Sequence, residues 1–512
     1  MGSMIVQTGS GAVEGESADG VARWLGIPYA APPVGDLRWR APRPPEPWSD
    51  PRPATAFGAA APQPANEIIR FADGVTQSED CLTLNVWVAD GVDRDAALPV
   101  LFWIHGGAYM FGSAAQAGFD GRALVASGEV VLVTVNYRLG ALGFLDLTRW
   151  STPQHPFDGN LALRDLLLAL EWVRSNIGAF GGDPDQVTIW GESAGGGLVT
   201  TLLAVPSAAG LFHRAIAHSS PATSIYGLER AAGIADRFLE AVDIAPDAVA
   251  TMRDLPIDRL VAAASRVYSE VPETTPGVIA FTPVVDGELL PEHPVTVLAD
   301  GRGIPVPLLI GTNRDEASFF KFMKSPLMPI ESATILRMFQ EIARERPDLE
   351  LPSEAQVTSA YAGRSTKAVG LSVAGDIGFR MPTLWLVEGH ARVAPVHLYR
   401  FDWATPMLHV LGIGAAHGTE LPYAFGNLDG GPKDITFRLG GRRRGAALSQ
   451  RMRARWTAFA VAGDPTGDAT PGWPAYEPES RATLVIDAKD EVVDDLDAEL
   501  RRAWGASVLS FE

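Results

Sequence analysis

FGGDPDQVTIWGESAGG, residues 180–196, is the stretch of this chain that constrains its fold most strongly. The run 186–190 has the β-branched and aromatic residues of a strand, and the run 196–203 is compatible with a helix. Between them lies the pentapeptide GESAG at 191–195, a G-x-S-x-G sequence at a turn from strand to helix. This order is typical of a nucleophile elbow, in which a strained turn exposes a serine hydroxyl above the end of the strand.

The elbow predicts a nucleophile and part of its surroundings. Glycines on both sides of Ser193 are needed because side chains there would collide with the neighbouring strand and helix. The N–H of Ala194 is expected to point at the oxyanion that develops during attack. The segment therefore predicts ester hydrolysis through an acyl-serine intermediate.

A near copy of the pentapeptide, GESAD at 15–19, lacks two features of an elbow. Asp19 replaces the second glycine, and the sequence predicts no strand before it. We therefore expect this segment to be a surface turn.

The composition excludes some classes of partner. The chain has 512 residues and a formal net charge of −19, which disfavours nucleic acids and anionic membranes as partners. The sequence does not tell whether these carboxylates simply cover the surface or line a cleft that attracts cationic substrates. No apolar run approaches the ~20 residues that span a bilayer, so no membrane partner is expected.

The N-terminal sequence MGSMIVQTGSG favours a cytoplasmic protein, because it has neither the basic nor the apolar region of a signal peptide. Export of a precursor that was trimmed earlier is the alternative. Residues 1–3, before Met4, are typical of a cloning remnant. Cys81 is the single cysteine, so an intrachain disulfide is excluded.

Strands and helices are expected to alternate along the chain, which predicts an α/β fold with a mostly parallel sheet covered on both faces. Large α/β enzymes grow by insertion, so we expect one catalytic domain over residues 1–512. The expected strands are 98–104, 130–135, 186–190, 304–310 and 395–401, the expected helix is 161–177, and helical insertions that could wall a cleft are expected at 227–264 and 331–374.

The sequence HGGA at 105–108 directly follows the expected strand 98–104. Its glycines allow backbone N–H groups to turn inward, and with Ala194 they would supply two or three donors to an oxyanion. A simple Gly-Gly turn is the alternative, and the elbow favours the catalytic interpretation.

The acid and the base are harder to choose. In α/β-hydrolases the triad follows the order serine, acid, histidine. Asp315 and Glu316 both follow the expected strand 304–310, and spacing does not choose between them. Among nine histidines, His409 and His417 lie in the loop after strand 395–401, and the small residues around His417 favour it. The others stand in the oxyanion loop, before the acid, at a helix end or inside a strand: His105, His155, His213, His218, His293, His390 and His397.

Over nearly its whole length the chain resembles the type-B carboxylesterases, the family of bacterial p-nitrobenzyl esterases and cholinesterases. The segment 180–196 resembles the serine signature of that family, and SEDCLTLNVW at 78–87 resembles its second signature. Further counterparts are GIPYAAPPVGDLRW (26–39), WIHGGAY (103–109), NYRLG (136–140), PVVDGELLP (283–291) and GDP (463–465). The resemblance implies an α/β-hydrolase fold.

The resemblance also implies roles for individual residues. It matches the acid to Glu316, the base to His417 and the oxyanion donors to Gly107, Ala108 and Ala194. An alanine at 108 resembles the bacterial carboxylesterases. No metal or organic cofactor is implied.

This chain departs from the family pattern in places. Cys81 has no partner for the disulfide of secreted animal members, which fits a reducing compartment. The sequence HSS at 218–220 stands where Gln-Ser-Gly is frequent, Ala317 where glycine is common, and Leu166 where glutamine is frequent. These departures concern the environment of the triad, not the reaction.

The expected function is that of a serine carboxylesterase acting on a small-molecule ester, as a monomer or weak homo-oligomer. Carbamates, thioesters, amides and lactones stay open, because a triad does not discriminate among them. A non-catalytic relative is disfavoured because every triad position is filled. Apolar residues near the motifs, if they are not core packing, predict a pocket for short to medium acyl or aromatic esters: Tyr109, Met110, Phe111, Phe319, Phe320, Met323, Met407 and Leu408.

Overall fold

The computed structural model describes residues 4–66, 69–323, 325–361, 365–431 and 434–511. The expected cloning remnant, residues 1–3, lies outside the described residues.

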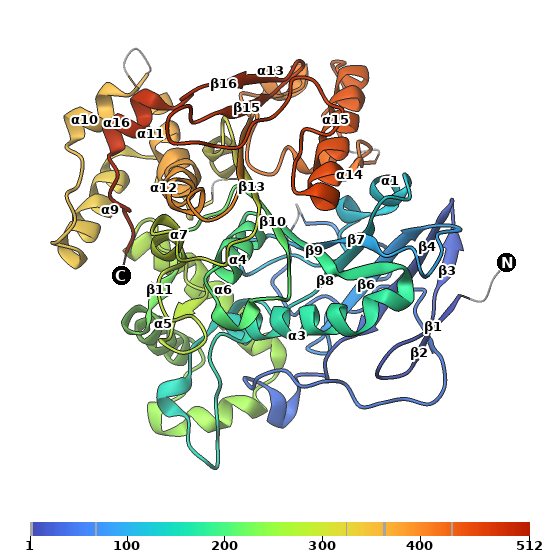
Figure 1. The fold of residues 1–512 in the computed structure, drawn as a ribbon. Helices are drawn as coiled ribbons and strands as arrows, with labels where there is room; N and C mark the ends of the chain where they lie inside the picture. The colour runs from blue at the N-terminus through green and yellow to red at the C-terminus, as the bar shows by residue number, and fades with distance from the viewer. Residues whose placement is uncertain (1–3, 67–68, 324, 362–364, 432–433, 512) are drawn as a thin grey trace.

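An 11-stranded sheet forms the centre of the molecule, in the order β16-β15-β14-β13-β10-β9-β7-β8-β6-β4-β3 (Figure 1). The strands from β15 to β8 run parallel, and antiparallel strands close both edges. The parallel strands are β15 (Thr483–Ile486), β14 (Val396–Phe401), β13 (Leu308–Asn313), β10 (Arg214–His218), β9 (Gly182–Glu192), β7 (Leu98–Ile104) and β8 (Val131–Val135). The edge strands are β16 (Glu491–Val493), β6 (Thr83–Ala89), β4 (Val21–Pro28) and β3 (Glu16–Ala18).

Both faces of this sheet are buried, which explains the continuous apolar runs of its central strands. Alternate residues of β7 enter two different cores. Phe102 packs in the core that contains α3 (Leu161–Asn176) and α4 (Ala194–Leu202), whereas Trp103 packs in the core that contains α15 (Arg442–Ala462). Figure 1 shows α3 and α15 on opposite sides of the sheet. The expected α/β-hydrolase fold is thus observed.

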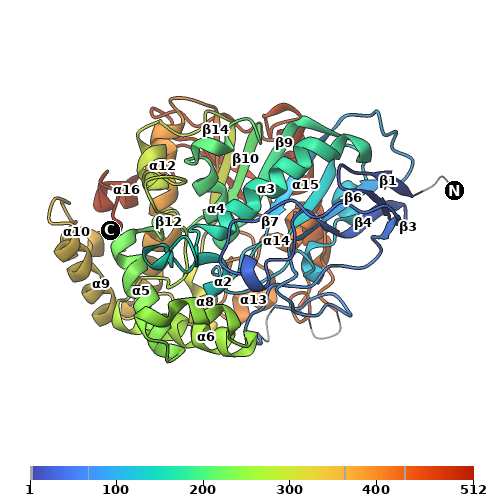
Figure 2. The same cartoon turned by 90° about the horizontal axis from the view of Figure 1, so that it is seen from below.

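The helical insertions gather beside one part of the sheet, where α5, α6, α9 and α10 form one side of the molecule (Figure 2). They are α5 (Leu228–Ala241), α6 (Ile257–Thr274), α9 (Ser332–Glu345), α10 (Glu354–Ser359) and α11 (Thr366–Gly375), followed by a π-helical segment (Asp376–Arg380) and α12 (Met381–His390). The prediction of helices in both insertions is confirmed.

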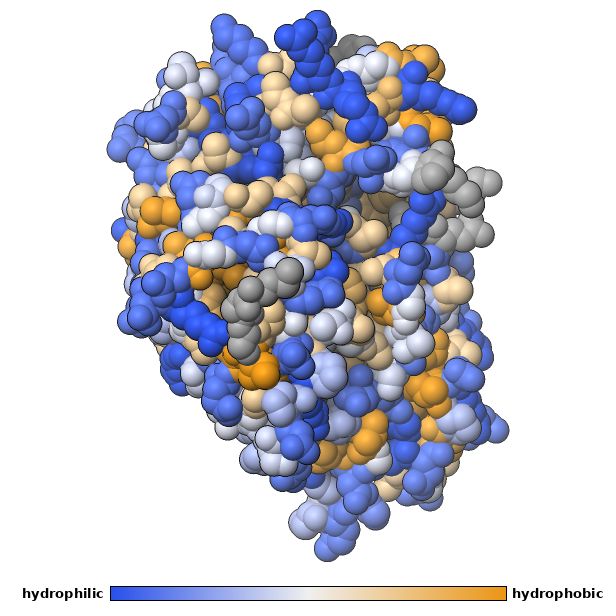
Figure 3. Space-filling model, turned by 90° about the vertical axis from the view of Figure 1, so that its right-hand side faces the viewer, coloured by the Kyte–Doolittle hydropathy of each residue, from blue (hydrophilic) through white to orange (hydrophobic). Residues whose placement is uncertain are grey.

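Short elements complete the chain. The helices are α1 (Arg122–Val125), α2 (Gly140–Phe144), α7 (Pro294–Ala299), α8 (Ala317–Phe322), α13 (Pro406–Val410), α14 (Leu421–Phe425) and α16 (Ala498–Trp504). The strands are β1 (Ile5–Gln7), β2 (Ala12–Glu14), β5 (Arg52–Pro53), β11 (Tyr226–Gly227) and β12 (Val284–Val285). On the face that bears the N-terminal strands, hydrophobic residues are scattered among hydrophilic ones (Figure 3).

Two local predictions need correction. The strand expected at 304–310 begins only at Leu308 as β13, because Pro305 and Pro307 have no N–H for a sheet ladder. The near copy of the elbow is not a turn, since Ser17 lies in β3 and follows strand β2. Its antiparallel pairing with β4 holds it at the sheet edge, and its hydroxyl donates to Asp90.

Candidate active site

The elbow around Ser193 joins β9 directly to α4. Ser193 has φ 57° and ψ −125°, a conformation that L-residues rarely adopt. A Cβ on Gly195 would lie 2.1 Å from the carbonyl oxygen of Ile104. A Cβ on Gly191 would lie 2.5 Å from the carbonyl of Gly195. The glycines of the motif are therefore required by close backbone packing on both sides of the serine.

Three side chains from distant segments meet at this turn. The Ser193 hydroxyl lies 2.8 Å from Nε2 of His417, and Nδ1 of His417 lies 2.7 Å from Oε2 of Glu316. Since Nδ1–H donates to the carboxylate, Nε2 is free to accept the serine proton. Glu316 and His417 are both buried, at 3% and 8% exposure.

The second oxygen of Glu316 is held as firmly as the first. Its Oε1 accepts hydrogen bonds from the Ser219 hydroxyl at 2.6 Å and from the Asn313 N–H at 2.7 Å. Three of the four acceptor positions of the Glu316 carboxylate thus have a hydrogen-bond partner, which fixes its rotation. Ser219 has a positive φ of 45°, so the chain is strained where it supplies this hydroxyl.

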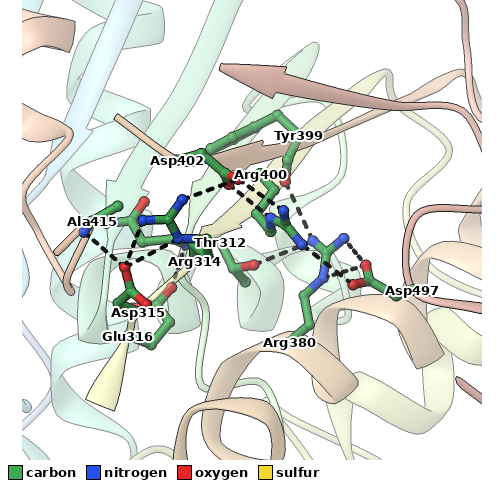
Figure 4. Close-up of polar contacts among 11 residues, drawn as sticks. Thr312, Arg314, Asp315, Glu316, Arg380, Tyr399, Arg400, Asp402, Ala415 and Asp497 are labelled. Atoms are coloured by element: carbon green, nitrogen blue, oxygen red, sulfur yellow. Dashed lines mark hydrogen bonds and ion pairs between the residues drawn. The ribbon is translucent and has the colours of Figure 1, made fainter. Parts of the chain in front are cut away.

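Asp315, the other candidate acid, makes different contacts (Figure 4). Its Oδ2 accepts the N–H of Ala415 at 3.1 Å and two bonds from Arg314 at 3.2 Å. Its own N–H donates to the carbonyl of Ala415 at 2.9 Å. Asp315 thereby joins the loop of Glu316 to the loop of His417, while Glu316 alone of the two reaches the imidazole. His409, the other candidate base, is exposed on α13.

An ion-pair network continues from Asp315 at the carboxyl ends of β13 and β14 (Figure 4). Arg314 lies 3.7 Å from Asp402, which accepts two bonds of 2.8 Å from Arg400. Arg400 lies 3.8 Å from Asp497, which also pairs with the buried Arg380. Arg380 donates in turn to the Thr312 hydroxyl at 3.2 Å and to the Tyr399 carbonyl at 3.4 Å. The network ties the acid loop to the start of α16.

The oxyanion loop also has a strained backbone. Gly107 and Ala108 have φ values of 119° and 52°, and a Cβ on Gly107 would lie 2.2 Å from the Phe111 carbonyl oxygen. Within the described part of the chain, the N–H groups of Gly107 and Ala108 donate to no other residue. A Cβ on Gly106 would lie 3.0 Å from Cβ of Ser193, so this loop lies against the nucleophile.

His105 supports the oxyanion loop. Burial lowers its pKa to about 4, so the imidazole is neutral at physiological pH. Its Nδ1 lies 2.8 Å from the carbonyl of Gly106, and its ring stacks on Tyr137 at 4.5 Å. The hydroxyl of Tyr137 donates to the His105 carbonyl at 2.6 Å.

Glu192, which the sequence reasoning did not assign a role, faces the base. Its Oε1 lies 3.2 Å from Nε2 of His417. Burial raises the pKa of Glu192 to about 8, and the carboxylates of Glu420 and Glu316 act in the same direction. Burial alone would lower the pKa of His417, but Glu192 and Glu316 outweigh it and raise this pKa to about 9. Glu192 acts on His417 through its negative charge, so a proton on Glu192 weakens its pull on the imidazole cation.

A second buried pair, His218 and Glu420, lies behind the site. Nε2 of His218 accepts the indole N–H groups of Trp190 and Trp456, both at 2.9 Å. This leaves Nδ1–H to donate to Glu420 at 3.3 Å and makes His218 a neutral imidazole. Asn313 donates to the other oxygen of Glu420. The HSS departure in the sequence pointed to residues 218 and 219, but nothing local pointed to Glu420.

A cavity of about 80 Å³ opens at Ser193. Tyr109 and Phe320, two of the expected pocket residues, line it. The rings of Phe320 and Phe379 also lie 5.0 and 4.6 Å from the ring of His417. The other expected pocket residues are not among those that line this cavity: Met110, Phe111, Phe319, Met323, Met407 and Leu408.

Neither a metal site nor a membrane-spanning helix is found among the described residues. No group of three or more His, Cys, Asp or Glu side chains in these ranges is arranged to hold a metal ion. Within the same ranges, no helix is both long and apolar enough to cross a membrane.

Comparisons with known proteins agree with this geometry. The model of the Carboxylesterase family matches residues 2–504. The para-nitrobenzyl esterase of Bacillus subtilis is 38% identical over 509 residues, which cover 98% of either chain. The phenmedipham hydrolase of Pseudarthrobacter oxydans is 33% identical over 96% of this chain and 97% of its own.

Solved structures give the same result. A thermophilic PNB esterase superposes with a TM-score of 0.85 at 36% identity, covering 98% of this chain and all of the other. A carboxylesterase of Geobacillus stearothermophilus superposes with a TM-score of 0.84 at the same identity and coverage. The chain belongs to the carboxylesterase family and is a serine carboxylesterase that hydrolyses carboxylic esters.

Proposed function

We propose that Ser193 is the nucleophile, that His417 is the general base, and that Glu316 orients the imidazole and stabilises its cation. The observation that carries this proposal is the continuous hydrogen-bonded chain from Ser193 Oγ through His417 to Glu316, at 2.8 and 2.7 Å. These distances lie within the range that proton transfer requires. Attack of Oγ on the ester carbonyl would transfer the hydroxyl proton to Nε2 and form a tetrahedral intermediate.

The N–H groups of Gly107, Ala108 and Ala194 are the proposed oxyanion donors. The amides of Gly107 and Ala108, which donate to no other described residue, support this role. The amide of Ala194 is at the first position of α4, where a helix leaves N–H groups unpaired. Such preorganised donors stabilise the charge that develops on the carbonyl oxygen.

Collapse of the intermediate breaks the bond to the alcohol, and His417 returns its proton to the leaving oxygen. The acyl group then remains on Ser193. Water attacks this acyl-enzyme with His417 again as base, and the carboxylic acid leaves with Ser193 restored. These steps use only groups of this chain and water.

The proposed substrates are esters with short to medium acyl chains or aromatic groups. The cavity at Ser193 supports this class, because it is small, at about 80 Å³, and its walls are mainly apolar. The related para-nitrobenzyl esterase, named for an aromatic substrate, agrees with this proposal.

We further propose that residues 1–512 form one catalytic domain in a monomer or weak homo-oligomer of the cytoplasm. The family match over 2–504 and the uninterrupted sheet from β16 to β3 support the single domain. The single cysteine, Cys81, is buried as a free thiol, which suits a reducing compartment.

The test is a series of initial rates on p-nitrophenyl esters from acetate to palmitate, with Ser193→Ala in parallel. We expect the highest kcat/KM at short to medium chains and a loss of about 10⁴-fold or more in the variant. A variant that keeps normal turnover would overturn the assignment of Ser193, and an optimum at palmitate would overturn the substrate class.

A further inference from the structure

The far wall of the catalytic cavity comes from the last described residues of the chain. Leu509, Ser510 and Phe511 follow α16 and line the same cavity as Ser193 and Ala108. All three are buried, at 2%, 6% and 5% exposure. Residues 509–511 therefore belong to the walls of the site. In Figure 1 this segment runs from α16 toward the helices of the insertions.

The ring of Phe511 is held from behind. It lies 6.4 Å from the ring of Tyr226 in an edge-on arrangement, and the Arg230 guanidinium lies 5.0 Å from the centre of the Phe511 ring. Arg230 also lies over Tyr226 at 5.1 Å, and it donates to both oxygens of Glu345 at 2.6 and 2.5 Å. These contacts fix Phe511 between α5 and the end of α9.

Side chains of α9 pack around the same ring. Met338 and Ile342 line the cavity beside Phe511. A Cβ on Gly277 would lie 2.7 Å from the Met338 sulfur and 3.4 Å from the Phe511 ring, so the packing here is close. On its outer side, Ser510 also lines a separate cavity of about 660 Å³. At this residue the wall between the two cavities is therefore a single residue thick.

The position of the cavity indicates which part of an ester it receives. The leaving alcohol must lie beside His417, because that imidazole protonates it. Ala108 and Ala194, whose N–H groups face the proposed oxyanion, line the cavity, whereas His417 is not among the described residues that do. The rings of Phe320 and Phe379 line the cavity and pack on the His417 ring, so they stand between the cavity and the base, and this lining fits the acyl side of the carbonyl.

We propose that Phe511, supported by Leu509, closes the acyl pocket and limits the length of the acyl chain that Ser193 accepts. This inference rests on the proposed function of Ser193 and adds the element that sets its acyl selectivity. Phe511→Ala removes the ring that closes the pocket, so acyl chains longer than the wild-type optimum gain apolar contacts. Each methylene that becomes buried is worth about a fourfold gain in kcat/KM, and two are worth about fifteenfold.

The experiment compares kcat/KM on p-nitrophenyl acetate, butyrate, hexanoate, octanoate and decanoate for the wild type and Phe511→Ala. We expect the optimum to move by two or more carbons, and the ratio of kcat/KM on the longer esters to kcat/KM on acetate to rise by about fifteenfold for two newly buried methylenes, since the acetyl group is too short to reach the wall. Phe511→Leu should move the optimum in the same direction by less, and it decides the question if the alanine variant loses acetate hydrolysis as well.

A matched control is Phe339→Ala. Phe339 is in the same helix as Met338 but packs against Trp504 at 5.9 Å and does not line the cavity. The acyl-chain profile of Phe339→Ala should equal that of the wild type. A second control uses alkyl acetates, which vary only the alcohol, so the alcohol-chain profile of Phe511→Ala should also equal that of the wild type. An unchanged acyl profile in both Phe511 variants, or an equal shift in Phe339→Ala, would overturn the inference. A wild type inactive on every ester, or activity that survives in Ser193→Ala, would instead overturn the proposed function.

Discussion

Replacing Glu192 with glutamine tests the electrostatics of the site, because it removes a charge and keeps the shape. The Glu192 carboxyl lies 3.2 Å from Nε2 of His417 and is one of the groups that raise the pKa of His417 to about 9. An opposite charge at such a distance raises a pKa by about 1 to 3 units. In Glu192→Gln the pKa of His417 should fall by a part of that amount.

The sign follows from the role of His417. The proposed base acts only when it is neutral, so activity is lost as pH falls through its pKa. With a lower pKa the base stays neutral at lower pH, so the acidic limb of kcat/KM should move toward acid by a part of about 1 to 3 pH units, because Glu316 still raises the pKa.

The assay is kcat/KM for p-nitrophenyl acetate over pH 4 to 10, a profile that reports groups of the free enzyme. Glu171→Gln is the matched control, since it removes the same charge from an exposed position on α3. An acidic limb of Glu192→Gln that stays in place, or that moves toward higher pH, would refute the reasoning.

Five further variants, at four residues, probe the acid of the triad and its neighbours. Glu316→Gln should lower kcat by about 10⁴-fold, as loss of an orienting carboxylate does elsewhere. Asp315→Asn should lower kcat by less than about tenfold, because Asp315 contacts backbone and Arg314. Equal losses of kcat in stopped-flow assays would contradict this assignment. Ser219→Ala removes a 2.6 Å hydrogen bond to the Glu316 carboxylate, so it should lower kcat/KM at least about tenfold while Tm stays almost unchanged. An unchanged kcat/KM would show that this bond does not position the acid. His218→Leu leaves two indole N–H groups and Glu420 without their partner, so it should lower the free energy of unfolding in urea by about 2 to 5 kcal/mol. His218→Gln should recover most of this free energy. Similar stabilities of the two variants would contradict the neutral-imidazole assignment.

The elbow could be predicted from sequence because the residues that form it are consecutive. The strand, the strained serine and the glycines lie within a few residues, and each glycine is needed by a contact that a Cβ would block. The sheet was predictable for a similar reason, since strands buried on both faces are continuous apolar runs. The five expected strands are observed, four of them with shifted ends, as at β13, where prolines delay the ladder, but the parallel strands β10 and β15 and the antiparallel edge strands were not predicted.

The choice between Asp315 and Glu316 could not be made from spacing. Adjacent residues point in different directions, and which one meets the imidazole depends on how the loop of His417 packs against the acid loop. The family resemblance named Glu316, and the geometry brings that side chain to His417. Glu192 and Glu420 are close to triad residues in sequence, but they were missed because their contacts with His417 and His218 form only in the tertiary fold.

The walls of the pocket were the least predictable part. Six of the eight expected residues do not line the cavity, because nearness to a motif in sequence does not decide the direction of a side chain. Met110, for example, lies against Gly140 instead. Conversely, Phe511 is more than 300 residues from Ser193, and no local sequence pattern predicts that it lines the cavity at Ser193.

The most direct test of the central claim is mass spectrometry of the enzyme after reaction with an organophosphate, followed by peptide mapping. The account predicts one phosphoryl adduct per chain, on the peptide that contains Ser193, formed in step with the loss of esterase activity. It also predicts that His417→Ala forms this adduct far more slowly. Complete inactivation with the adduct on another residue, or full activity after Ser193 is modified, would contradict the account.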